Sequence, residues 1–301
     1  MRAGCASTSV DTSLVLPLSR RKTSGSAGSW IIPPAAVLGI LFFYPLALIL
    51  AASFTAGKAA PTLLNYPAVL GSSQFIRALG HTIVIALFSS TGCLALGLVL
   101  SLILAFVPFP GSRLLARVID TFIALPTFLI ALAFTFVYGT AGILNASLMQ
   151  LLHLNLPPLD FLYSQWGVIL AEVTVYTPFV MRPLLAAFSL VEQAEIEIAG
   201  SLGAGTFRIM RQIILPTAIP ALLTGGSLCL LLTTNEFGIV LFIGAKGVVT
   251  LPLLIYSKAI QEFDYTSACV LAVVNVALSL ALYSLYRATL TWFGGRRAGL
   301  V

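Results

Sequence analysis

The residues that could do chemistry in this chain stand inside long apolar runs. The run Thr233 to Gly238 reads Thr-Thr-Asn-Glu-Phe-Gly, four hydrogen-bonding side chains followed by an aromatic and a small residue. An ionised side chain at the centre of a bilayer costs at least about 2.5–3.5 kcal/mol on insertion scales, so this carboxylate should face protein or water. A polar pathway is one interpretation, and hydrogen bonding between helices without a ligand is the other. The pathway candidates are Thr233, Thr234, Asn235, Glu236 and Phe237.

A second polar set lies in the apolar run from Gln165 to Leu190. Its charged and hydrogen-bonding members are Glu172, Thr174, Tyr176, Thr177 and Arg182. Glu172 and Arg182 carry opposite charges, so a link between them is conceivable. We add Glu172 and Arg182 to the pathway candidates, again with interhelical hydrogen bonding as the alternative.

Cysteines and histidines give no sign of metal binding or nucleophilic catalysis. The four cysteines are scattered, and Cys93, Cys229 and Cys269 fall inside apolar runs, so neither a disulfide framework nor a metal site is indicated. His81 and His153 have no metal-type partners nearby in the sequence. We therefore expect no catalytic residue, no metal and no cofactor bound by this chain.

The composition predicts an integral membrane protein. Of 301 residues, 59% are hydrophobic and 9% are charged, and the mean hydropathy is +1.03, whereas soluble proteins have about 25% charged residues. Apolar stretches of about 20 residues suit helices that cross a hydrocarbon core of about 30 Å. We predict an all-α protein with six transmembrane helices, at about 30–53, 81–107, 121–140, 165–190, 217–243 and 265–286.

Basic residues predict the orientation of these helices. With the N-terminus in the cytoplasm, only Lys58, Arg77, Lys246 and Lys258 of the 16 basic residues fall outside, which is a strong positive-inside bias. This bias accounts for the net charge of +6, so nucleic acid is not an expected partner. The predicted order is a disordered cytoplasmic tail (1–29), a first helix (30–53), a periplasmic loop (54–80), a core (81–287) with a cytoplasmic loop (192–220), and a cytoplasmic tail (288–301).

Proline and small residues inside the spans are compatible with a helix bundle in lipid. Small residues four apart, such as Gly97 and Ser101 or Ala221 and Gly225, let helices approach closely. Pro126, Pro178 and Pro183 are tolerable because neighbouring helices can satisfy the freed backbone groups. No internal repeat is evident, so an inverted-repeat secondary transporter gains no support.

The loop from Glu192 to Pro220 is unusually polar for a connector between two apolar runs. Ala199, Gly200 and Gly203 are small enough to let a short helix enter a groove, and Leu202 and Phe207 offer apolar side chains. Charge comes from Glu197, Arg208 and Arg211. We predict a docking element for another subunit, and the alternative is an amphipathic helix lying on lipid headgroups.

This loop resembles that of a known family. Glu197-Ile198-Ala199-Gly200-Ser201-Leu202-Gly203, followed by Ile213-Ile214-Leu215-Pro216, is similar to the E-A-A-x-x-x-G…I-x-L-P loop of ABC-importer permeases, with Ile198 where that pattern usually has Ala. The resemblance implies a MetI-like, type-I ABC-importer permease bundle whose loop holds a coupling helix for an ATP-binding subunit. The implied coupling residues are Glu197, Ala199, Gly200, Leu202, Gly203, Phe207 and Pro216. The chain has no G-x-x-x-x-G-K-[ST] motif, so ATP and Mg²⁺ are expected in a separate ATPase partner.

Two further stretches narrow the resemblance. The Glu236-Phe237-Gly238 motif and the Pro178 to Arg182 step look like the sulfate and molybdate branch, and 120–130 and 225–247 closely resemble 2-aminoethylphosphonate permeases of bacterial ABC importers. This implies a multi-pass inner-membrane subunit that imports 2-aminoethylphosphonate with an ATP-binding subunit dimer, a second permease subunit and a periplasmic binding protein. Import of sulfate or another small oxyanion is the first alternative, and an autonomous secondary transporter is the second.

Overall fold

The computed structural model describes residues 31–55 and 63–298, with only the backbone given for 289–298. The tail predicted at 1–29 therefore lies outside the described residues. Every regular element in the described ranges is a helix, and six helices are long and apolar enough to span a membrane. They are Ile32–Ser53, Ser73–Phe106, Thr127–Leu152, Gln165–Phe188, Thr206–Thr234 and Tyr265–Ala288. The all-α class and the six spans predicted from the sequence are confirmed.

The chain divides into two units, residues 1–48 and 49–301. The described part of the first unit contains α1 (Ile32–Leu38), a π-helical turn η1 (Gly39–Phe43) and the beginning of α2 (Tyr44–Ser53). Pro33 lies in the first turn of α1, where an N–H group would have no helical partner in any case.

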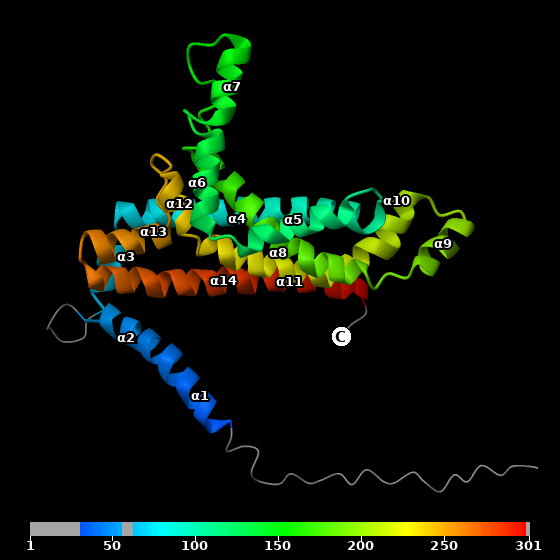
Figure 1. Cartoon of the computed structure of the whole chain (residues 1–301). Helices are drawn as coiled ribbons and strands as arrows, with labels where there is room; N and C mark the ends of the chain where they lie inside the picture. The colour runs from blue at the N-terminus through cyan, green and yellow to red at the C-terminus, as the bar shows by residue number, and fades with distance from the viewer. Residues whose placement is uncertain (1–30, 56–62, 299–301) are drawn as a thin grey trace, which may run out of the picture. The chain divides into compact units, whose positions relative to one another are not determined.

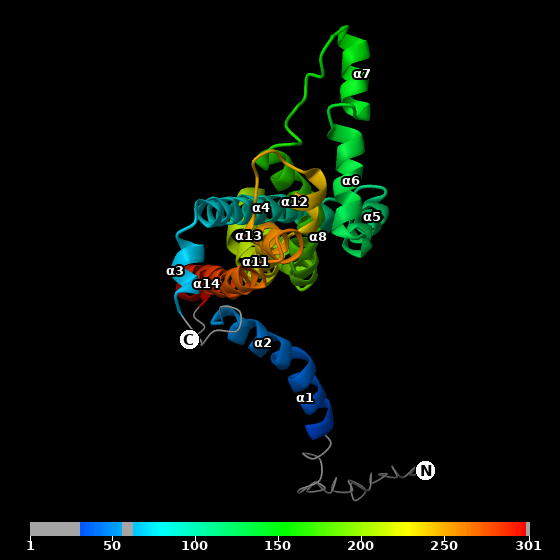
Figure 2. The same cartoon turned by 90° about the vertical axis from the view of Figure 1, so that its left-hand side faces the viewer.

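The second unit holds the remaining helices (Figure 1). In chain order they are α3 (Asn65–Leu70), α4 (Ser73–Phe106), α5 (Ser112–Ala124), α6 (Thr127–Tyr138), α7 (Ile143–Leu152), α8 (Gln165–Phe188), α9 (Gln193–Ser201), α10 (Thr206–Ile209), η2 (Met210–Ile214), α11 (Leu215–Thr234), α12 (Gly238–Ile243), α13 (Leu251–Tyr256), η3 (Ser257–Gln261) and α14 (Tyr265–Ala298). Helices α4, α8, α11 and α14 run side by side, whereas α6 and α7 stand across their direction in both views (Figures 1 and 2).

Helix α8 is the centre of the core, and two neighbouring helices approach it closely at Val180. A Cβ atom on Gly97 of α4 would lie 3.0 Å from Val180 Cβ, and one on Gly225 of α11 would lie 2.9 Å from Val180 Cα. Both neighbouring helices therefore approach α8 at points where only glycine leaves enough room. This close approach is the packing role that small residues have in membrane bundles.

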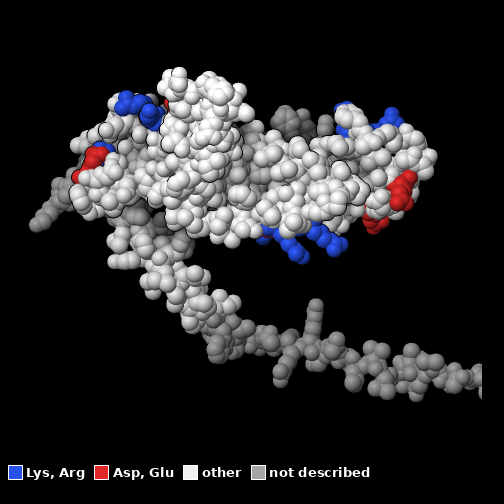
Figure 3. Space-filling model, turned by 45° about the horizontal axis from the view of Figure 1, so that its top comes forward, with Lys and Arg blue, Asp and Glu red and all other residues white. Residues whose placement is uncertain are grey.

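The charged surface agrees with a bundle that lies in lipid. In Figure 3, acidic side chains gather near the two ends of the second unit, and most of the surface between them is uncharged. Many large apolar side chains of the long helices are exposed, for example Leu87, Phe88 and Val99 of α4. An exposed apolar flank on long helices is expected where lipid replaces water.

Several helix boundaries differ from the predicted ones. Helix α4 begins at Ser73, eight residues before the predicted start at His81, because the Ser72 side chain accepts a hydrogen bond from Phe75 N at 3.2 Å and caps the helix. The predicted loop 54–80 therefore contains α3 and the first two turns of α4.

The predicted third and fifth spans are interrupted. Pro126 separates α5 from α6, and Leu125 before it is extended (φ −83°, ψ 135°), as expected for a residue that precedes proline. The candidate span consequently runs from Thr127 to Leu152 rather than from 121 to 140. In the fifth span, α11 ends at Thr234, and α12 begins only at Gly238.

Candidate functional site

The loop predicted at 192–220 begins with two short helices, α9 and α10, which extend beyond the ends of the long helices (Figure 1). Its second half is already η2 and the beginning of α11, so the candidate span starts at Thr206 and not at 217 as predicted. Helix α9 ends in a Schellman motif, in which Gly203 N donates to Gly200 O and Ala204 N donates to Ala199 O, both at 3.0 Å. Gly203 has φ +82°, a left-handed conformation that side chains disfavour. The spacing of Ala199, Gly200 and Gly203 is therefore explained locally by the geometry of a helix end.

Leu202 and Phe207 of this loop are largely uncovered by the residues that the structure describes. Leu202 is 82% exposed and Phe207 is 75% exposed, and Glu197 and Gly200 are exposed beside them. Phe207 also lines a surface pocket of about 430 Å³ together with Arg208, Arg211 and Gln212. Exposed leucine and phenylalanine next to charged groups form a surface suited to a protein partner.

Two other residues assigned to coupling, Ala199 and Pro216, are less open to a partner. Ala199 is half-buried within α9, and Pro216 occupies the second position of α11, in the first turn. Proline is favoured there because its fixed φ suits a helix and its missing N–H is not needed. A contact of Pro216 with another subunit stays a prediction.

Glu236 lies in the break between α11 and α12. The sequence had instead predicted that it lies inside one continuous helix. Its carboxylate accepts a hydrogen bond from Ile239 N at 2.7 Å and a second one from the Tyr176 hydroxyl of α8. Glu236 is buried, so these bonds compensate the loss of water. The carboxylate thus joins the first turn of α12 to the central helix.

Gly238 completes this junction. A Cβ atom at Gly238 would lie 2.9 Å from Thr127 Oγ1, at the beginning of α6, and 3.3 Å from Glu236 Oε1. The rings of Phe128 and Phe242 meet beside it, with centroids 5.4 Å apart. The Glu-Phe-Gly motif therefore brings three elements, α6, α8 and α12, to one point.

The other candidates of this run are held by contacts within the chain. Thr233 and Thr234 donate to Leu230 O, one turn earlier in α11. Asn235 accepts from Asn275 Nδ2 of α14 at 2.9 Å. The Phe237 ring packs against Tyr256, with centroids 5.0 Å apart. Asn235 and Phe237 thus have the interhelical role that the sequence left open, whereas the bonds of Thr233 and Thr234 stay within α11. A role of these side chains in a substrate pathway stays a prediction.

Glu172 and Arg182 do not meet. Ten residues of helix separate them, which corresponds to about 15 Å along the axis at 1.5 Å per residue. Arg182 Nε instead lies 3.0 Å from Asp120 Oδ1 of α5, and the two side chains are 58% and 49% exposed. The link considered from the sequence is therefore wrong, and the partner that sequence reasoning missed is Asp120.

Glu172 is fully buried between α4, α8 and α11. Among the described residues, neither of its carboxylate oxygens has a hydrogen-bond partner, and the same holds for Ser89 Oγ of α4. Cys93 Sγ of α4 lies 4.0 Å from the backbone carbonyl oxygen of Glu172, so α4 packs directly against α8 at this level. Glu172 thus lies inside the packed core of this conformation, away from the Asp120–Arg182 pair.

Comparison with known proteins agrees with this arrangement. The family model of the binding-protein-dependent transport system inner membrane component matches residues 97–297. The protein of Salmonella typhimurium named "Putative 2-aminoethylphosphonate transport system permease protein PhnU" is 57% identical over 275 residues, which cover 91% of this chain and 96% of the relative. The "Probable sulfate transport system permease protein cysT" of Prototheca wickerhamii is 29% identical over 73% of this chain and 85% of its own length.

The fold is similar to that of solved transporters. A chain from the crystal structure of a bacterial ABC transporter involved in the import of alginate has a TM-score of 0.73 at 17% identity and covers 90% of this chain and 96% of its own. A chain of the methionine ABC transporter has a TM-score of 0.54 and covers 72% of this chain and 94% of its own. With its family match, its relatives and its six-span fold, the chain belongs to the inner membrane components of binding-protein-dependent transport systems, the permease subunits of ABC importers.

Proposed function

We propose that this chain is the permease subunit that carries 2-aminoethylphosphonate across the inner membrane. The observation that supports the substrate is the 57% identity to the relative named for 2-aminoethylphosphonate transport, because this identity extends over 91% of the chain. The aligned region includes the stretches at 120–130 and 225–247, which contain the beginning of α6 and the junction of α11 with α12 at Glu236.

The proposed source of energy is a separate pair of ATP-binding subunits that hold ATP and Mg²⁺. Two observations support this assembly: the exposed Leu202 and Phe207 on the helical loop, and the sequence of α9, which resembles a coupling loop. A second permease subunit and a periplasmic binding protein complete the proposed importer. The solved alginate transporter provides a parallel, since one of its structures is a complex with a periplasmic protein.

The proposed orientation places both termini and the loop 192–220 in the cytoplasm. The positive-inside bias supports it, with four of 16 basic residues outside. Single cysteines introduced at Leu202 and at Leu156, in a background without the native cysteines, test this orientation in intact cells. An impermeant thiol reagent should label position 156 and leave position 202 unlabelled, and the reverse pattern would contradict the proposal.

Sulfate is the second candidate substrate because the chain also has 29% identity to sulfate permeases. The test is uptake into proteoliposomes that contain the complete importer, with labelled 2-aminoethylphosphonate and labelled sulfate compared side by side. We expect ATP-dependent uptake of the phosphonate that survives collapse of the proton gradient. Uptake of sulfate alone would favour the second candidate, and uptake driven by the gradient without ATP would favour a secondary transporter.

A further inference from the structure

A pocket of about 380 Å³ opens between the beginning of α4 and the segment formed by α13 and η3, on the side proposed to be periplasmic. One wall comes from Gln74, Arg77 and His81, whose spacing of three and four residues places them on one face of α4. The opposite wall consists of Leu253, Leu254, Ser257, Gln261 and Glu262, and Gly247 and Val249 close the pocket. The sequence predicts Gln74 and Arg77 in the periplasmic loop 54–80 and His81 at the start of a span, and it gives them no joint role.

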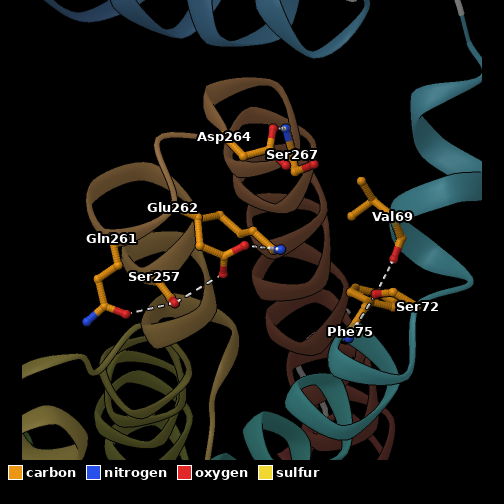
Figure 4. Close-up of polar contacts among 9 residues, drawn as sticks. Val69, Ser72, Phe75, Ser257, Gln261, Glu262, Asp264 and Ser267 are labelled. Carbon is orange, nitrogen blue, oxygen red and sulfur yellow. Dashed lines mark hydrogen bonds and ion pairs between the residues drawn. The ribbon is translucent and has the colours of Figure 1, made fainter.

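The charges in this pocket do not balance. Glu262 is paired with Lys258, whose Nζ lies 2.7 Å from Glu262 Oε2, and Ser257 donates to Glu262 Oε1 at 3.4 Å (Figure 4). Arg77 is exposed to the pocket and takes part in no ion pair with any residue that the structure describes. The guanidinium of Arg77 is therefore the uncompensated charge of the pocket, which favours an anion.

The polar groups beside Arg77 are held by contacts within the chain. His81 Nδ1 lies 3.2 Å from Val249 N and 3.3 Å from Val249 O, so the Val249 backbone occupies this ring nitrogen and Nε2 is the imidazole atom left for a ligand. Ser257 Oγ donates to Gln261 Oε1 at 2.9 Å, which leaves the Gln261 NH₂ group as a donor (Figure 4). A fixed guanidinium fork with further N–H donors is the arrangement that suits phosphate-like and carboxylate oxygens.

From this geometry we infer that the pocket is an outer holding site for the anionic head of a small phosphonate, which Arg77 binds before the ligand enters the bundle. The inference rests on the proposed function for the identity of the ligand. The phosphonate oxygens face Arg77, because Glu262, the one carboxylate among the residues that line the pocket, is already paired with Lys258. This pocket is separate from the junction at Glu236, where Tyr176 and the backbone of Ile239 already bind the carboxylate.

The experiment uses the complex of the permease with its ATP-binding subunits, without binding protein, and labelled 2-aminoethylphosphonate in equilibrium dialysis. Arg77→Gln should weaken binding about tenfold or more, because it removes the charge-assisted hydrogen bonds of the guanidinium to the phosphonate oxygens. Lys246→Gln is the matched control, because Lys246 is an exposed basic residue of the adjacent loop that does not line the pocket. The control should bind like the unmodified complex.

Uptake by the complete importer separates the two proposals. Arg77→Gln should raise KM for 2-aminoethylphosphonate about tenfold and leave kcat and the affinity for the binding protein unchanged. Equal binding and equal KM for Arg77→Gln and the unmodified importer would overturn the holding site while the transport function stands. If Arg77→Gln weakened only the binding of the periplasmic binding protein, the holding site would also be overturned, because the pocket would then be a docking site for that protein. Absence of phosphonate uptake by the unmodified importer would instead refute the proposed function.

Discussion

The hydroxyl group of Tyr176 in α8 donates a hydrogen bond to the carboxylate of Glu236, and the same carboxylate accepts from the backbone of Ile239. One buried side chain thus connects the central helix to the first turn of α12. Glu236, which the sequence offers as a substrate-binding residue, is thus held by two hydrogen bonds within the chain.

Replacement of Glu236 should therefore act first on stability. We expect Glu236→Ala to lower the stability by about 1.5–3 kcal/mol, the contribution of hydrogen bonds to a charged group. Glu236→Gln keeps an oxygen for Ile239 N and an amide that can donate to Tyr176, so it should unfold at nearly the same temperature. Thermal unfolding of the purified protein in detergent measures both, with Tyr176→Phe as the partner in a double-mutant cycle. An alanine variant as stable as the unmodified protein would contradict the structural role.

Gly203 gives a test of the coupling loop. Gly203→Ala places a side chain in the left-handed region, at a cost of about 1–2 kcal/mol, and should distort the end of α9. Ser201→Ala is the control, because Ser201 is an exposed residue of α9 that is not among the coupling residues, and alanine favours helix. We expect Gly203→Ala to reduce substrate-stimulated ATP hydrolysis in the assembled importer and Ser201→Ala to leave it unchanged. The same rate for both variants would argue against a need for this loop geometry.

The contact of Gly97 with Val180 predicts sensitivity to a single methyl group. Gly97→Ala should destabilise the bundle by about 1–3 kcal/mol through overpacking, since its Cβ would lie 3.0 Å from the Val180 side chain. Gly80 lies on the same helix with open space around it, so Gly80→Ala is the matched control. Thermal unfolding in detergent compares the two variants. A Gly97→Ala protein as stable as Gly80→Ala would show that α4 and α8 can separate at little cost.

The Asp120–Arg182 pair is half-exposed, so its effect on stability should be small. We expect Arg182→Gln to change the free energy of unfolding by less than about 1 kcal/mol. The coupling between Asp120→Asn and Arg182→Gln in a double-mutant cycle should shrink further at high salt. A large loss of uptake by Arg182→Gln at unchanged stability would support the pathway role predicted for Arg182, because the ion pair alone does not explain such a loss.

The sequence by itself determined the membrane character, the helix class and the family. Apolar runs of about 20 residues suffice for the first two because a bilayer permits few alternatives to the helix. The loop motif from Glu197 to Pro216 indicates the family, because the motif is a continuous stretch of sequence that can be recognised without knowing how the helices pack. Even the separation of Glu172 from Arg182 could have been calculated, because ten helical residues span about 15 Å.

The tertiary structure decided which polar groups meet. Only the packing of α8 against α11 and α12 brings Tyr176 to Glu236, 60 residues away in the chain. Likewise, Arg77 and Gln261 share a pocket because α4 and the α13–η3 segment are adjacent, and nothing in the spacing of either segment predicts that neighbour. Periodicity reports which face of a helix is apolar, whereas the partner of a polar side chain depends on how separate helices pack, which a local pattern does not record.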